Sequence, residues 1–180
     1  MLIGITGKSG SGKSTIANLF TDFYHIDVDK IVYELHTREE IISKVNEIFP
    51  ETIEDNKINK KKLSNIVFND KNKLDTLETI MLPYMVLEID SLIFKNENCI
   101  IDYILLPKTK YFNMCDITIL VEIDENIRKN RVLKRDNITE IEYNLRDRNG
   151  FNTDKYSYDY IISNDYEALN IIKSLKKLKK

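Results

Sequence analysis

Residues 7–15 read GKSGSGKST and follow the apolar opening MLIGIT. Gly7, four intervening residues, Gly12, Lys13 and Ser14 fit the pattern G-x-x-x-x-G-K-[ST]. A strand-like run precedes the pattern, and STIANLF follows it with helical spacing of its apolar residues. Glycines let successive backbone N–H groups turn toward phosphate oxygens, and the N-terminus of the next helix adds partial positive charge. The stretch therefore predicts a strand, a phosphate-binding loop (P-loop) and a helix in succession.

A P-loop in this setting predicts a site for a nucleoside triphosphate. We expect the Lys13 ammonium to reach the β- and γ-phosphates and the Ser14 hydroxyl to ligate Mg²⁺. Small residues also make ordinary solvent loops. The coincidence of strand, eight-position motif and helix argues against that alternative, and leaves open which molecule accepts the phosphate.

The composition predicts one soluble domain. The chain has 180 residues, 42% of them hydrophobic, and 27 basic residues stand against 29 acidic ones. This length can bury a full core, and the balanced charge predicts neither a nucleic-acid nor a membrane partner. No charged segment precedes an apolar stretch at the N-terminus and no run of 18 apolar residues occurs, so we expect a cytoplasmic protein. Cys99 and Cys115 are expected to be reduced core residues, and the basic residues 176–180 a solvated last helical turn.

Five strand-like runs alternate with helical stretches along the chain. They occupy residues 1–6, 24–29, 97–106, 116–124 and 158–163. This alternation predicts an α/β fold of three layers, with a parallel five-stranded sheet. Residues 30–97 are too long for a simple crossover and are interpreted as a helical substrate-binding insertion, and residues 131–155 as a lid. The core is then about residues 1–29, 98–130 and 156–180.

Two acidic residues follow the second predicted strand in HIDVDK. In extended geometry Asp27 and Asp29 project to one side, toward the edge of the sheet where open α/β folds bind ligands. We predict Asp29 as the general base and Asp27 as a residue that holds Mg²⁺ through water. The alternative is an N-cap of the following helix, to which Asp29 is well suited.

A basic stripe follows the fourth predicted strand in ENIRKNRVLKRD. Arg128, Arg131 and Arg135 stand three and four residues apart, so their guanidinium groups are expected to share one helix face. Such a stripe at the start of the predicted lid can clamp phosphates.

These segments together resemble the dephospho-coenzyme A kinases. The resemblance runs in order through GITGKSGSGKSTIANLF, IDVDKIVYEL, LETIMLPYMVLEI, IIDYILL, DITILVEIDENIRKNRVLKRDNIT and DYIISNDYEALNIIKSL. It spans nearly the whole chain. It implies a P-loop kinase fold that uses ATP and Mg²⁺ to phosphorylate the ribose 3′-hydroxyl of dephospho-coenzyme A, the last step of coenzyme A synthesis.

The resemblance also implies roles for individual residues. Asp29 matches the base, Arg131 the arginine that opens the lid and meets phosphates, and Asp102 the acidic residue that ends the third strand. We place Asp102 in the acceptor site with Asp29, Leu82 and Pro83. The expected catalytic residues are Asp29, Lys13 and Arg131. The expected ATP-binding residues are Gly7, Gly10, Ser11, Gly12, Lys13, Ser14, Thr15 and Arg135, and the expected metal-binding residues are Ser14 and Asp27.

The chain departs from the family pattern mainly at the acceptor side. The usual His-Pro reads Leu82-Pro83, and the usual PLLFE reads ILLPK from Ile104 to Lys108. The usual glutamine of the lid is Gly150 or is missing.

Other functions fit parts of the sequence. A nucleoside or nucleotide kinase shares the P-loop, the lid and the fold, and differs in the helical insertion. A GTP-binding switch has support from NKLD at residues 72–75 and DRNG at residues 147–150, but the two motifs stand in reversed order and NKLD opens a helical pattern. An ATP-dependent nucleic-acid or assembly module would favour Asp-Glu at the end of a strand, where this chain has Asp102-Tyr103.

Overall fold

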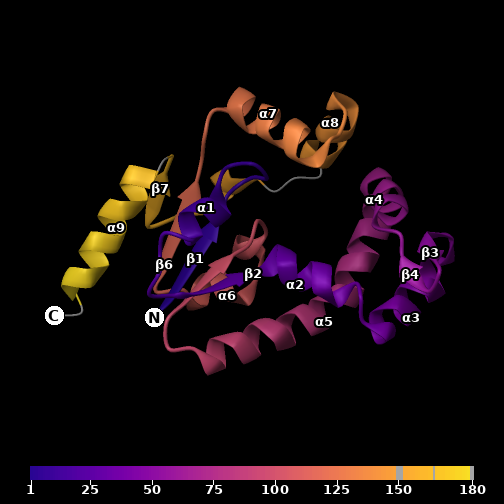
Figure 1. The fold of residues 1–180 in the computed structure, drawn as a ribbon, viewed down its shortest axis with the longest axis horizontal. Coiled ribbons are helices and arrows are strands. Elements are labelled where there is room, and N and C mark those ends of the chain that lie inside the picture. Colours follow the sequence, from indigo (N-terminus) through magenta and orange to yellow (C-terminus); the bar gives the residue numbers. More distant parts are fainter. Residues whose placement is uncertain (149–151, 164, 179–180) are drawn as a thin grey trace.

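The structure, a computed structural model, describes residues 1–148, 152–163 and 165–178. Its main sheet has five parallel strands in the order β2-β5-β1-β6-β7. The strands are β1 (Leu2–Thr6), β2 (Tyr24–Asp27), β5 (Cys99–Asp102), β6 (Ile117–Val121) and β7 (Tyr160–Ile162). Each of the five strand-like runs of the sequence contains one of them, and helices cover both faces, so the three-layer α/β prediction is confirmed (Figure 1).

All five residues of the central strand β1, LIGIT, are buried, so the strand is covered on both faces. Ile3 and Ile5 pack with α1 (Lys13–Ala17) and α9 (Asp165–Leu178) on one face of the sheet. Leu2 belongs to the core on the other face. Gly4 has no room for a side chain there, since a Cβ would lie 2.6 Å from Leu106 Cδ2. That face is covered by α5 (Lys71–Lys95), α6 (Lys110–Met114) and the short 3₁₀ helix η2 (Leu106–Lys108).

The predicted helical insertion contains four helices that share a core with one face of the sheet. They are α2 (Val28–Leu35), α3 (Glu39–Ile48), α4 (Lys60–Asn69) and α5, with the 3₁₀ helix η1 (Pro50–Thr52) between α3 and α4. A short hairpin of β3 (Ile53–Glu54) and β4 (Lys57–Ile58) was not expected from the sequence. Its turn residues Asp55 and Asn56 have φ of 49° and 59°, which these residue types tolerate.

The predicted lid region lies on another side of the sheet, above the strands in Figure 1. It contains the second half of α7 (Glu125–Asp136), then α8 (Glu140–Arg148) and the 3₁₀ helix η3 (Thr153–Lys155). Asp124 caps α7 by accepting hydrogen bonds from the N–H groups of Asn126 and Ile127. A single carboxylate oxygen, Asp124 Oδ1, therefore caps α7 three residues after the end of β6.

The predicted geometry of the paired aspartates was wrong. Strand β2 ends at Asp27, and Asp29 lies in the first turn of α2 rather than in extended backbone. Asp27 is the N-cap, with its Oδ1 accepting the Lys30 N–H at 3.0 Å, so the capping alternative for Asp29 was wrong as well. Helix formation begins this early because Val28, Ile31 and Leu35 recur at helical spacing and are all buried.

Three further expectations concern the cysteines, the NKLD segment and membrane-spanning helices. Both cysteines are free thiols, Cys99 buried and Cys115 partly buried. Residues 72–75 lie within the start of α5, as the reading against a GTP-binding switch expected. Of the helices that the structure describes, none combines the length and apolar composition needed to cross a lipid bilayer.

Candidate active site

The P-loop borders a cavity of about 1160 Å³ at the carboxyl ends of the strands. Strand β1 ends at Thr6, and α1 begins at Lys13 with Gly12 as its N-cap at φ +101°, a left-handed conformation that favours glycine. Gly7 lies beside β6, where a Cβ would stand 2.3 Å from the Val121 carbonyl oxygen, so it has a packing role beneath the loop. The residues that line the cavity are Gly10, Ser11, Gly12, Lys13, Ser14, Thr15, Ile16, Val121, Ile123, Arg131, Lys134, Arg135 and Ser163.

Lys13 is largely buried, at 8% exposure, although it carries a charge. No ion pair within the described part of the chain involves its ammonium group. A buried ammonium group without a carboxylate partner is costly, and an anion in the cavity would offset this cost. The geometry therefore favours a phosphate-bearing ligand at this point.

Ser14 and Asp102 form the polar floor of the site. The Ser14 hydroxyl donates to Asp102 Oδ2 at 2.5 Å, and Asp102 is 4% exposed at the end of β5. Asp102 pairs in register with Asp27 on the neighbouring strand. The sequence prediction placed Asp102 with the acceptor, whereas the structure places its carboxylate against the P-loop hydroxyl.

His25 is a neighbour of this floor that the sequence analysis did not identify. Its Nε2 lies 3.4 Å from Asp102 Oδ2, and its Nδ1 lies 3.0 Å from Asn18 Oδ1. The alternation of side chains along β2 could have suggested it, because His25 and Asp27 share one side of the strand.

Asp29 is exposed, with charged groups around it. Its pKa is raised above the ordinary value, chiefly because protein on several sides limits the hydration of its carboxylate. The positive charge of Lys13 opposes this shift, while the negative charges of Asp102 and Asp27 add to it. Lys13 of the P-loop and Asp102 at the end of β5 are thus electrostatic neighbours of Asp29, which lies in the first turn of α2.

The three arginines of the basic stripe have different environments. Arg131 is exposed and lines the cavity, with Nη1 3.7 Å from the position of a Cβ on Gly12. Arg135 also lines it, and donates to Ser9 Oγ at 3.0 Å while pairing with Asp136. Arg128 faces the P-loop as the other two do, but it is 3% exposed and is engaged by Glu125 and Asp147, so the expectation that its guanidinium clamps phosphates was wrong. Helical spacing alone could not show which face of α7 packs inward.

A second cavity, of about 470 Å³, lies between α2, α5 and the chain that follows β5. Leu82 and Lys108 line it, and the exposed Pro83 is not part of its lining. Its other lining residues are Val32, His36, Asp75, Leu77, Glu78, Thr79, Met81, Met85, Tyr103, Leu105 and Thr109.

Two residues of the second cavity have shifted pKa values. Burial lowers the pKa of His36, whose Nδ1 donates to the Val32 carbonyl oxygen at 2.7 Å and so leaves Nε2 as an acceptor. Burial raises the pKa of Tyr103, and the negative charge of Asp29 raises it further. Asp29 is thus an electrostatic neighbour of Lys13 in one cavity and of Tyr103 in the other.

Comparison with known proteins gives the family. The model of the family described as CoaE, dephospho-CoA kinase, matches residues 1–169. The chain belongs to the dephospho-CoA kinase family. A dephospho-CoA kinase of Bartonella henselae is 34% identical over 146 residues, which cover 77% of this chain and 75% of that protein.

Solved structures agree with this fold. TT1252 from Thermus thermophilus aligns over 100% of this chain and 98% of its own, with a TM-score of 0.80 and 23% identity. The dephospho-CoA kinase from Campylobacter jejuni aligns over 99% of this chain and 98% of its own, with a TM-score of 0.65 and 21% identity. At these identities the likeness shows the P-loop kinase fold alone.

The expected departures from the dephospho-CoA kinase pattern lie partly in the lining of the second cavity. Leu82 and Lys108 are in its lining, and the Ile104 carbonyl oxygen accepts the Thr6 hydroxyl at 2.9 Å. Gly150, which was expected to stand for the usual lid glutamine unless that residue is missing, lies outside the described residues.

Proposed function

We propose that this chain transfers the γ-phosphoryl group of ATP to the ribose 3′-hydroxyl of dephospho-coenzyme A. The observation that carries the proposal is that Asp29, in the first turn of α2, is an electrostatic neighbour both of Lys13, which lines the P-loop cavity, and of Tyr103, which lines the second cavity. A carboxylate between a phosphate cradle and a second ligand cavity is suitably placed for transfer from one ligand to the other. Membership of the dephospho-CoA kinase family supports this choice of acceptor.

The P-loop cavity is the proposed ATP site. Backbone N–H groups of Gly10 and of residues 12–15, at the N-terminus of α1, offer donors and partial positive charge to the phosphates, whereas the Ser11 N–H donates to the Lys8 carbonyl oxygen at 3.1 Å. Lys13 would neutralise the β- and γ-phosphates, and Arg131 and Arg135 would meet charge from the side of α7. Lys134 lines the same wall and adds a positive charge that the sequence analysis did not identify.

The residues around Ser14 fit a magnesium ion. Mg²⁺ prefers oxygen ligands and is usually held by one or two carboxylates, water and the phosphates of the substrate. Ser14 and Asp102 present such oxygens in direct contact, and Asp27 pairs with Asp102 in the sheet. Within the described residues no group of three or more His, Cys, Asp or Glu side chains could hold a metal without a substrate. When bound with ATP, the ion would supply charge neutralisation at the phosphates.

Asp29 is the proposed general base. A ribose hydroxyl is a weak nucleophile at neutral pH, and a nearby carboxylate can orient it and take its proton as the new O–P bond forms. The carboxylate must be ionised for this task, and Lys13 favours the ionised form against the loss of hydration. Its place in the first turn of α2 gives the carboxylate a fixed backbone support.

The second cavity is the proposed acceptor site. Its lining combines apolar side chains with Tyr103, Lys108 and the neutral His36. This combination suits a ligand that carries phosphates together with a base or a thiol-bearing arm. Leu82 and Lys108 would give this chain acceptor contacts that differ from the usual pattern.

Initial rates with ATP and a panel of acceptors test the proposal. The panel contains dephospho-coenzyme A, adenosine, uridine and nucleoside monophosphates, and the product with the first acceptor is identified as coenzyme A by mass spectrometry. The Lys13→Ala variant controls for contaminating kinases. Far better turnover of uridine or of a monophosphate would replace this function with that of a nucleoside or nucleotide kinase.

A further inference from the structure

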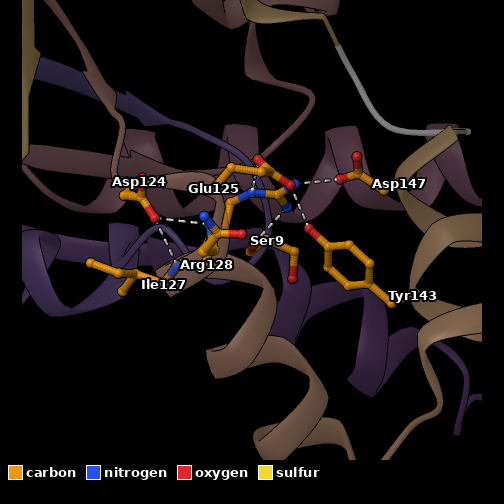
Figure 2. A network of polar contacts seen from close by, with 8 residues as sticks. Ser9, Asp124, Glu125, Ile127, Arg128, Tyr143 and Asp147 are labelled. Carbon is orange, nitrogen blue, oxygen red and sulfur yellow. Dashed lines mark hydrogen bonds and ion pairs between the residues drawn. The ribbon is translucent and has the colours of Figure 1, made fainter.

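Arg128 connects the predicted lid to the P-loop, because all three nitrogen atoms of its guanidinium group donate hydrogen bonds. Its Nε and Nη2 donate to the Glu125 carboxylate at 3.0 and 2.5 Å, and Nη2 also donates to Asp147 at 2.7 Å. Its Nη1 donates to the Ser9 backbone carbonyl oxygen at 3.2 Å. Figure 2 shows the guanidinium enclosed by Glu125, Asp147, Tyr143 and Ser9.

The surroundings hold Arg128 in one conformation. Tyr143 donates its hydroxyl to Glu125 at 2.8 Å, and its ring lies 5.4 Å from Arg128 Cζ. A planar guanidinium with several charge-assisted hydrogen bonds is far more restrained than an exposed arginine. At 3% exposure Arg128 is closed to solvent, so it does not meet the phosphates itself.

The contact with Ser9 determines the direction of the peptide group that follows. The described chain has no cis peptide bonds, so the Ser9–Gly10 peptide is trans, and its C=O and N–H groups point in opposite directions. With the carbonyl oxygen held by Arg128, the Gly10 N–H must point away from α7. No hydrogen bond within the described chain uses that N–H, and Gly10 lines the P-loop cavity.

The packing of Gly10 enforces the same orientation. Its φ is +84°, and a Cβ there would lie 2.6 Å from Val132 Cγ2 and 3.0 Å from the Arg128 carbonyl oxygen. Arg135 holds Ser9 at a second atom, its Oγ, at 3.0 Å. Helix α7 therefore holds the Ser9–Gly10 segment by hydrogen bonds to the Ser9 carbonyl oxygen and the Ser9 hydroxyl and by close packing against Gly10.

We infer that Arg128 is a positioning residue that turns the Gly10 N–H toward the phosphates of the bound nucleotide. It acts through the peptide plane and touches no substrate. The inference rests on the proposed function only in that the P-loop binds a nucleotide. Glu125 and Asp147 hold the guanidinium group, and the ion pair with Asp147 connects Arg128 to α8.

Selective isotope labelling can observe this one peptide. The chain has five glycines, and serine precedes only Gly10 and Gly12 among them. Protein with ¹³C-carbonyl serine and ¹⁵N-glycine therefore gives two carbonyl-to-amide correlations, and the Ser11–Gly12 peptide is an internal control for the Ser9–Gly10 peptide. ADP is the probe, with binding measured by calorimetry in the same buffer.

We expect ADP to shift the Gly10 amide proton of the parent protein strongly. The Arg128→Lys variant keeps the positive charge but lacks the guanidinium donors that hold Ser9. Its Ser9 carbonyl signal should therefore move even without ADP. Its Gly10 response should weaken, and the Kd for ADP should rise roughly tenfold, the scale of one hydrogen bond to a charged group. The matched control is Lys129→Gln, which removes the ion pair between Lys129 of α7 and Glu140 of α8 and leaves every contact of Arg128, and it should change this Kd by less than about threefold.

Two results would overturn the inference. One is a parent protein that binds ADP without a response of the Gly10 amide, a readout that holds even if Arg128→Lys does not fold. The other is a Lys129→Gln variant that loses as much ADP affinity as Arg128→Lys at equal melting temperature, which would mean that any loosening of α7 against α8 has the same effect and that Arg128 is a structural tether. A parent protein that does not bind ADP at all would instead remove the proposed function.

Discussion

Ser14 donates its hydroxyl hydrogen to Asp102 across 2.5 Å, and this bond joins the first turn of α1 to the end of β5. The two residues are 88 positions apart in the sequence. The arrangement brings a carboxylate against the residue that the P-loop pattern assigns to Mg²⁺.

Asp102→Asn tests this relationship. An amide keeps an acceptor for the Ser14 hydroxyl and removes the negative charge, so we expect the apparent affinity for Mg²⁺ to fall about 10- to 100-fold. Initial rates at saturating ATP, measured against Mg²⁺ concentration, give this affinity, and nucleotide binding in the presence of a chelator should stay close to that of the parent. An unchanged Mg²⁺ dependence would count against a role for Asp102 at the ion.

Lys13→Ala removes the buried ammonium group of the P-loop. We expect turnover to fall by roughly 10²-fold or more, because a preorganised electrostatic donor is worth about that much in the transition state. Turnover is compared at saturating substrates, with circular dichroism as the control for folding. A folded variant within about threefold of the parent rate would contradict the assigned role.

Asp29→Asn separates catalysis from capping. We expect turnover to fall about 10²–10⁴-fold with both substrates still bound, since the amide keeps the shape and cannot accept the proton. The matched variant is Asp27→Ala, which removes the observed N-cap of α2 and should cost about 1 kcal/mol of stability. Turnover and melting temperature are measured for both. An active Asp29→Asn variant would move the search for the base to Asp27 or Asp102.

The pH dependence follows from the raised pKa of Asp29. A base must be ionised, so activity should be lost as pH falls through this pKa, which lies above the ordinary value of 3.8. The acid limb of kcat/KM for the acceptor is therefore expected at higher pH than for an ordinary aspartate, and Asp29→Asn should lack it. If the Asp29→Asn variant keeps the same acid limb, that limb belongs to another titrating group.

Arg131→Ala tests the exposed arginine of α7. Within the described residues no ion pair holds its guanidinium, which leaves the group available to the transferring phosphoryl. We expect turnover to fall more than ATP affinity measured without acceptor, because charge on that group is greatest during transfer. Arg135 has Asp136 and Ser9 as partners, so Arg135→Ala provides a comparison. Equal losses in rate and affinity for Arg131→Ala would indicate a ground-state anchor.

Local chemistry in the sequence was sufficient for much of this fold. The P-loop pattern, the five apolar runs and the helical spacing between them predicted the strand positions, the parallel sheet and the three layers. These features follow from nearest neighbours along the chain, because the side-chain periods of strands and helices and the backbone freedom of Gly12 are local properties. The sequence also predicted that Lys13 and Ser14 lie together in the P-loop, where both line the cavity, since their spacing from Gly7 is set within one loop.

Tertiary packing decided the relationships between distant residues. Asp27 and Asp29 read alike as part of a strand, but burial of Val28, Ile31 and Leu35 begins the helix between them and separates cap from candidate base. The three arginines of α7 share one spacing, and only the packing of α7 against the P-loop and α8 shows that Arg128 faces inward while Arg131 faces the cavity. The pairing of Asp102 with Ser14 depends on the order of strands in the sheet, which places β5 beside β1. Residues 88 positions apart become neighbours through long-range strand pairing, which no local pattern specifies.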